Sequence, residues 1–163
     1  MNKFIVCFSV YLDKKGEMKG LIAAHSGLRY IVLALLLIAI FNAIANLKSN
    51  KYEKKDKMIN LFAMISLHIQ LVLGLILYFT SDLVKFYKGM MGNTIDRFFT
   101  VEHILLMLVG ITLITLGRKK AEKQTDLGKR HKLILRYYGL GLVIIFISIP
   151  WPFIYPVIDA GYF

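Results

Sequence analysis

Residues 25–44 read HSGLRYIVLALLLIAIFNAI, an apolar run that opens with a histidine and, four residues later, an arginine. The apolar stretch as a whole covers residues 21–47, more than the roughly 20 residues that a helix needs to cross the hydrocarbon core of a bilayer. His25 and Arg29 are costly beside hydrocarbon, so each needs a partner, access to water or a function. The stretch therefore predicts a membrane-spanning helix with polar groups near one end.

Three more stretches have a similar length and apolarity, at residues 59–80, 98–117 and 133–152. Across the 163 residues, 57% of the side chains are apolar, which is above the usual range for a soluble domain. The alternating pattern of a membrane β-barrel strand is missing from the sequence, and the connections between the stretches are short. These features predict an all-α integral membrane protein, an antiparallel four-helix bundle that forms a single domain over residues 21–163.

Lysine and arginine counts in the connections predict the orientation. The first connection, KSNKYEKKDK, has five lysines, and the third, RKKAEKQTDLGKRHK, has seven lysines and arginines, whereas residues 81–97 have three. Positively charged connections stay in the cytoplasm. We therefore expect a multi-pass protein of the bacterial inner membrane, with both basic connections cytoplasmic and both termini and residues 81–97 outside.

The net charge of +11 does not indicate a nucleic-acid partner, because the basic residues lie between the apolar stretches rather than along one soluble face. The lipid bilayer is the expected partner. The chain has one cysteine, Cys7, which cannot form an internal disulfide or a cysteine-ligated metal centre by itself.

The N-terminal segment does not fit the four-helix plan. Residues 4–12, FIVCFSVYL, are apolar but too few to span a membrane, and the polar run DKKGEMKG follows them. A signal peptide would need small residues at a cleavage site, which are missing here. We interpret residues 1–20 as a leader or an interfacial segment, and we expect the natural start at Met18.

Polar residues near the outer ends of two helices predict a haem site. His25 and Arg29 lie on one face of the first helix, and Glu102 and His103 lie in the outer part of the third. Because both helices begin outside, His25 and His103 differ in depth by about two residues, roughly 3 Å. Ligation of one b-type haem needs two imidazoles from different helices at comparable depth. His25 and His103 are the predicted iron ligands, Arg29 is expected to pair with a propionate, and Glu102 is expected close by.

The other two histidines have different predicted roles. His68 is the alternative ligand, although it lies about 12 residues, or roughly 18 Å, before the outer end of its helix. His131, within GKRHK, is predicted to be a solvated loop residue. Since it has no depth-matched partner, one haem at most is expected.

Two alternatives to a haem site remain open at this stage. A quinone head group could exchange protons with His68 and Gln70, or with Glu102 and His103, but side chains two residues apart do not share a helix face. Alternatively, Arg29 and Glu102 form an ion pair between the first and third helices, and the chain is a cofactor-free accessory subunit. In each case an electron carrier or an accessory subunit is a better description than a stand-alone enzyme.

Four stretches carry a resemblance to a known group of proteins: HSGLRYIVLALL, HIQLVLGLILYF, RFFTVEHILLMLVGITLITLG and IPWPF. They resemble the short four-helix membrane proteins of the Bacteroidetes that are labelled cytochrome b or cytochrome-b-like, over residues 20–153. The resemblance implies a haem protein that transfers electrons in a respiratory or redox assembly, with subunits of that assembly or a quinone as partners. The similar proteins of this group begin just ahead of the HSGLR motif, which favours Met18 as the start. The chain lacks the two matched histidine pairs of the larger di-haem cytochromes b.

Overall fold

The computed structural model describes residues 3–49 and 51–151, with the side chains of residues 3–15 and 17 left out. The described part of the chain is helical and contains no strand. The elements in order are α1 (Lys3–Ala45), α2 (Lys54–Thr80), the short 3₁₀ turn η1 (Met90–Gly92), α3 (Thr94–Arg97), the π-helical turn η2 (Phe98–Glu102), α4 (His103–Lys123) and α5 (Leu127–Ser148).

Four helical segments are long and apolar enough to cross a membrane, as the sequence predicted: Met18–Ala45, Lys54–Thr80, Thr94–Lys123 and Leu127–Ser148. The third continues past the expected end at residue 117, because the basic residues after it are good helix formers and complement the negative C-terminal end of the helix dipole. The fourth begins six residues before the expected start. Asp126 caps its N-terminus, because the Asp126 side chain accepts a hydrogen bond from the Lys129 amide. The second also begins early, at Lys54 instead of residue 59, so charged residues lengthen three of the helices beyond their apolar parts.

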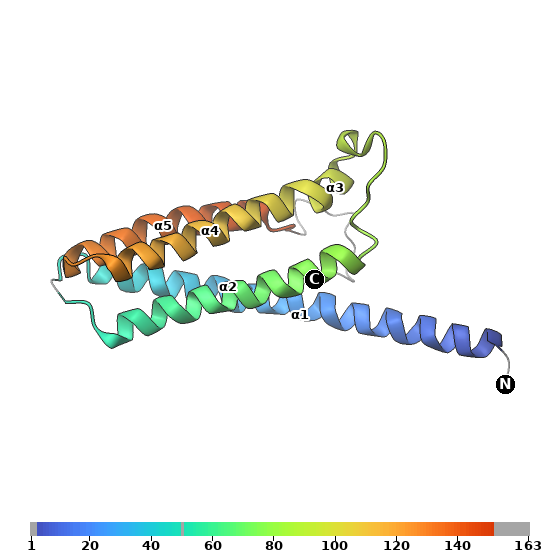
Figure 1. Cartoon of the computed structure of the whole chain (residues 1–163), viewed down its shortest axis with the longest axis horizontal. Helices are drawn as coiled ribbons and strands as arrows, with labels where there is room; N and C mark the ends of the chain where they lie inside the picture. Colours follow the sequence, from blue (N-terminus) through green and yellow to red (C-terminus); the bar gives the residue numbers. More distant parts are fainter. Residues whose placement is uncertain (1–2, 50, 152–163) are drawn as a thin grey trace.

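The polar run after the first apolar segment does not interrupt the backbone. The polar residues 13–20 lie within α1, which continues through Gly16 and Gly20, and the N-terminal part of this helix extends beyond the other helices in Figure 1. One glycine in a helix costs only about 1 kcal/mol, which a long helix tolerates. The interpretation of residues 1–20 as a leader or an interfacial segment falls mostly on side chains outside the described part.

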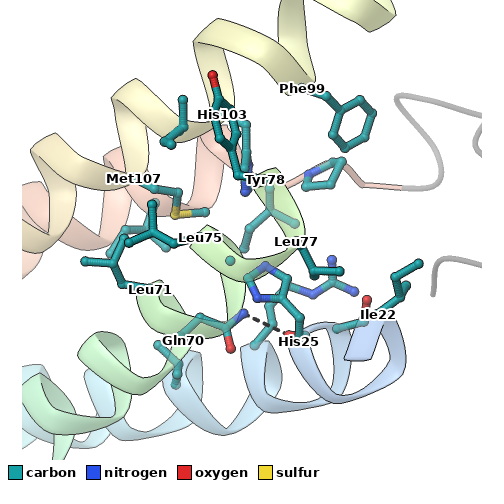
Figure 2. Close-up of a pocket in the computed structure, with 18 of the residues that line it drawn as sticks. Ile22, His25, Gln70, Leu71, Leu75, Leu77, Tyr78, Phe99, His103 and Met107 are labelled. Carbon is teal, nitrogen blue, oxygen red and sulfur yellow. Dashed lines mark hydrogen bonds between the residues drawn. The ribbon is translucent and has the colours of Figure 1, made fainter. Parts of the chain in front are cut away.

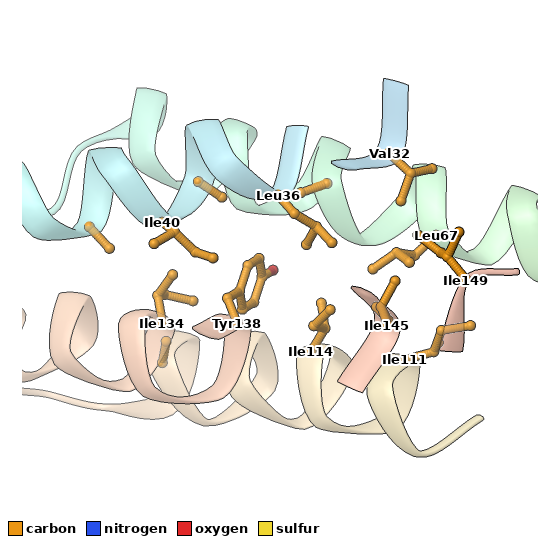
Figure 3. Packing of buried hydrophobic residues seen from close by; sticks show 14 residues of the cluster. Val32, Leu36, Ile40, Leu67, Ile111, Ile114, Ile134, Tyr138, Ile145 and Ile149 are labelled. Atoms are coloured by element: carbon orange, nitrogen blue, oxygen red, sulfur yellow. The ribbon is translucent and has the colours of Figure 1, made fainter. Parts of the chain in front are cut away.

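Figure 1 shows the connections α1–α2 and α4–α5 at the same end of the molecule, which we call the basic end. The core runs between the helices and includes Leu36, Ile114, Ile134 and Tyr138, all fully buried (Figure 3). Burial of these side chains against one another holds the four helices in a single unit.

Glycines let α4 and α5 approach closely. A Cβ atom added at Gly110 would lie 2.8 Å from Ile145 Cγ1, and one at Gly141 would lie 2.7 Å from Ile114 Cγ1. Small residues at such an interface allow the backbones to pack tightly where lipid offers no hydrophobic drive for association. This tight pairing fixes the end of α5, which contributes to the site described below.

His131 corrects the prediction of a solvated loop residue. It is 1% exposed, its Nε2 atom lies 3.0 Å from the Lys51 carbonyl oxygen, and its ring packs on Tyr52. The reason is the early start of α5, which places His131 in the second turn and on the inner face of the helix. His131 therefore joins the first connection to α5.

Tyr52 lies at the centre of a group of polar residues at the basic end. We call this group the basic-end cluster; its other members are Asn60, Glu122, His131 and Tyr138. The Tyr52 hydroxyl accepts from Asn60 Nδ2 at 2.9 Å and donates to Glu122 Oε1 at 3.4 Å, while the Tyr138 hydroxyl donates to the Asn60 carbonyl at 2.9 Å. Burial raises the pKa of the Tyr52 phenol, so that it keeps its proton and remains a donor. The cluster joins α2, α4, α5 and the first connection.

Candidate cofactor site

A cavity of about 160 Å³ lies between α1, α2, α4 and the end of α5, away from the basic end (Figure 2). We call this end of the bundle the cavity end. Most of the lining is apolar, from residues such as Leu71, Leu75, Phe99 and Met107, and the polar lining residues are His25, Ser26, Arg29, Gln70, Tyr78, Ser81 and His103. An apolar cavity with a few convergent polar groups is the usual form of a cofactor site.

His103 lines this cavity from the first turn of α4, directly after the π-helical turn. Its Nδ1 atom lies 2.7 Å from the carbonyl oxygen of Ser148. A carbonyl can only accept, so Nδ1 carries a proton, and in the neutral imidazole Nε2 then keeps its lone pair. The carbonyl is available because it belongs to the last turn of α5, where the helix offers no donor. The ring is thereby held in the tautomer and orientation of a metal ligand.

His25 reaches the cavity from α1 and is held by two residues of α2. Gln70 Nε2 donates to the His25 carbonyl oxygen at 2.8 Å. The imidazole lies against Gly74, where an added Cβ would be 3.0 Å from His25 Cε1. A side chain at position 74 would crowd the ring at its present distance from α2. His25 Nδ1 is buried and makes no hydrogen bond to any described residue.

Arg29 lines the same cavity one turn further along α1 and is 8% exposed. Its guanidinium donates to the Tyr30 hydroxyl at 3.4 Å and lies 5.9 Å from the centre of the Trp151 ring. A buried cation so near two imidazoles gives the cavity a positive end, which suits an anionic group such as a carboxylate.

The structure thus brings together His25, Arg29 and His103, and it places the other two predicted site residues elsewhere. His68 does not line the cavity, and its Nδ1 atom bonds to the Met64 carbonyl of its own helix at 2.8 Å. Glu102 forms an ion pair with Arg97 at 2.6 Å instead of the interhelical pair with Arg29 that the cofactor-free alternative expected. The π-helical turn places Glu102 toward the segment that precedes it.

Sequence reasoning did not give Gly74 or the Ser148 carbonyl a role, and it treated Gln70 only as a companion of His68. A glycine inside the apolar stretch HIQLVLGLILYF was the available signal for Gly74, because such a glycine often marks a close approach. The Ser148 contact uses a backbone oxygen, which no sequence pattern identifies. Gln70 lines the cavity and His68 does not, as their spacing of two residues implies.

A bare metal ion would need more ligands than this site has. Among the described residues, no group of three or more His, Cys, Asp or Glu side chains could hold one. The two imidazoles could instead hold a cofactor that brings most of the metal's ligands itself.

Comparison with known proteins identifies no relative: no protein family, curated protein or solved structure matches this chain. The resemblance to cytochrome-b-like proteins remains an expectation from the quoted motifs.

Proposed function

We propose that this chain is a small cytochrome-b-like membrane protein that holds one b-type haem between His25 and His103. The observation that carries the proposal is that imidazoles from α1 and α4 line one apolar cavity, and that His103 has its Nδ1 proton bound by a carbonyl, which leaves Nε2 free to ligate. Histidine ligands in proteins are held in this way by their second nitrogen.

Several groups in and around the cavity have a task in this proposal. The Ser148 carbonyl orients His103, while Gln70 and Gly74 set the position of His25. Arg29 supplies the positive charge for a propionate. The bound haem would supply a one-electron redox couple, and the apolar lining would limit access of water. The protein would then pass electrons within a respiratory or redox assembly.

We also propose an antiparallel arrangement in the bacterial inner membrane, with the basic end in the cytoplasm and both termini outside. Twelve lysines and arginines in the two connections of the basic end, against three in residues 81–97, support this orientation. Cysteines introduced as Ser49→Cys and Asn93→Cys in a Cys7→Ser background should react with a membrane-impermeant maleimide from opposite sides, Ser49→Cys from the cytoplasm and Asn93→Cys from outside. Labelling of Asn93→Cys only from the cytoplasm would contradict the orientation.

The haem proposal is tested by the reduced-minus-oxidised spectrum of the purified protein, made in cells supplied with a haem precursor. We expect a b-type band that is lost in His25→Ala and His103→Ala and retained in His68→Ala, because His68 does not line the cavity. A wild-type protein without this band, together with folded histidine variants, would indicate a cofactor-free accessory subunit.

A quinone is the second candidate occupant of the same cavity, in place of haem. One observation favours it: the Gln70 Oε1 atom is buried and accepts no hydrogen bond from the described residues, so it could accept one from a quinol hydroxyl. Titration of the purified protein with a short-chain quinol tests this, with Gln70→Leu as the variant. Unchanged quinol affinity in Gln70→Leu would remove the support for this candidate.

A further inference from the structure

The connection between α2 and α3, residues 81–93, covers one side of the candidate haem site. Ser81, Leu83 and Val84 of this connection line the cavity together with His25 and His103. A loop that contributes a wall to a cavity must itself be held in place, or the wall opens. Two residues of the following segment, Thr100 and Asp96, contact this loop with their side chains.

Thr100 is the first of these contacts. It lies in the π-helical turn η2, is 2% exposed, and its hydroxyl forms two hydrogen bonds with one residue of the loop. The Oγ1 atom accepts from the Lys85 amide at 3.1 Å and donates to the Lys85 carbonyl at 3.3 Å. The Thr100 carbonyl accepts from the Tyr78 hydroxyl of α2 at 2.9 Å. One residue therefore joins the end of α2, the loop and η2.

Asp96 holds the next part of the same loop. Its carboxylate accepts from the Tyr87 hydroxyl at 2.8 Å and lies 3.7 Å from Lys85 Nζ, and the residue is 8% exposed. Asp96 and Thr100 both belong to the segment that leads directly into His103. The loop is thus attached to the turn that positions a candidate ligand.

We propose that Thr100 is a positioning residue that fixes residues 81–85 as a cover on the candidate haem site, and that this cover limits both entry of water-soluble reagents and loss of the cofactor. The proposal rests on the proposed function for the identity of the cofactor. The π-helical turn connects Thr100 with His103. The His103 amide donates to the Phe98 carbonyl, so Thr100 lies inside the same wide turn that orients His103.

The cover is tested with a reporter cysteine that needs no haem. Leu83→Cys is introduced in a Cys7→Ser background, and the full chain is placed in nanodiscs, where both faces are accessible to a water-soluble maleimide. Thr100→Val keeps the side-chain shape and removes both hydroxyl bonds, and we expect it to raise the labelling rate about tenfold, the effect of losing one or two hydrogen bonds. Thr100→Ser keeps the hydroxyl and should restore slow labelling.

The matched control is Thr115→Val in α4, where the hydroxyl bonds only to the Ile111 carbonyl of its own helix at 2.8 Å. Labelling in this variant should equal that in the parent. Thr100→Val that labels no faster than the parent, Thr100→Ser that labels as fast as Thr100→Val, or an equal increase in Thr115→Val would each overturn the proposal.

A second measurement connects the cover to the cofactor. In haem-loaded protein, transfer of haem to an excess of apomyoglobin should be about tenfold faster in Thr100→Val than in Thr115→Val, because an open cover exposes the site. Equal transfer rates would contradict the role in cofactor retention. If the wild-type protein takes up no haem, the proposed function fails while the labelling result still decides whether Thr100 fixes the cover.

Discussion

The basic end and the cavity end both place histidines inside the bundle, but the histidines have different surroundings. At the basic end, His131 bonds to the Lys51 carbonyl and packs on Tyr52, within a cluster that links three helices. At the cavity end, His25 has a buried Nδ1 without a hydrogen bond to the described residues, and His103 lines the cavity while its Nδ1 atom bonds to the Ser148 carbonyl. Burial alone therefore does not identify a ligand: His131 is held by a backbone carbonyl and an aromatic ring, whereas His25 and His103 line a cavity.

The largest expected effect separates these two roles with one pair of variants. His131→Ala should lower the free energy of unfolding by about 2–4 kcal/mol, because it removes a buried side chain and leaves the Lys51 carbonyl without its bond. His103→Ala should abolish the haem band with a smaller loss of stability. Unfolding in a detergent titration and the absorption spectrum of each variant provide the measurements. Loss of the haem band in folded His131→Ala would contradict the assignment of His131 to the fold alone.

Two glycine substitutions give the next effect. Gly74→Ala places a methyl group 3.0 Å from the His25 ring and should reduce haem content several-fold by displacing the imidazole. Gly139→Ala in α5 is the control, since an added Cβ meets no atom within 4 Å there. That change should stabilise the helix by up to about 1 kcal/mol and leave haem content unchanged. Equal haem content in both variants would show that the approach of His25 to α2 is unimportant.

The smallest expected effect is that low pH destabilises the first turn of α5. The hydrogen bonds and charge of Lys129 lower the pKa of the exposed Asp126 carboxyl. A lowered pKa in the folded state means that the carboxylate contributes its stability at neutral pH and loses it as the pH falls below about 4. Hydrogen exchange of the first-turn amides of α5 should therefore quicken on acidification, and Asp126→Asn should remove much of this pH dependence. The haem band should be unchanged in Asp126→Asn. A changed band would show that the basic end affects the cavity end.

The sequence allowed the four membrane-spanning segments to be predicted, because length and apolarity are local properties. It also identified His25, Arg29 and His103, which the cavity brings together. It did not reveal the burial of His131, since that depends on α5 beginning at Leu127 within a charged segment. The pairing of Glu102 with Arg97 depends on a π-helical turn that has no sequence pattern of its own. Contacts through backbone oxygens, such as that of His103 with Ser148, follow only from the packed structure.

The central claim, that His25 and His103 bind one cofactor together, is tested most directly by the near-infrared magnetic circular dichroism of the oxidised, haem-loaded protein. The spectrum reports the axial ligands of the iron. We predict the low-spin signature of two histidines in the wild-type protein and in His68→Ala, and its loss in both His25→Ala and His103→Ala. A bis-histidine signature that survives in either His25→Ala or His103→Ala would contradict ligation by His25 and His103.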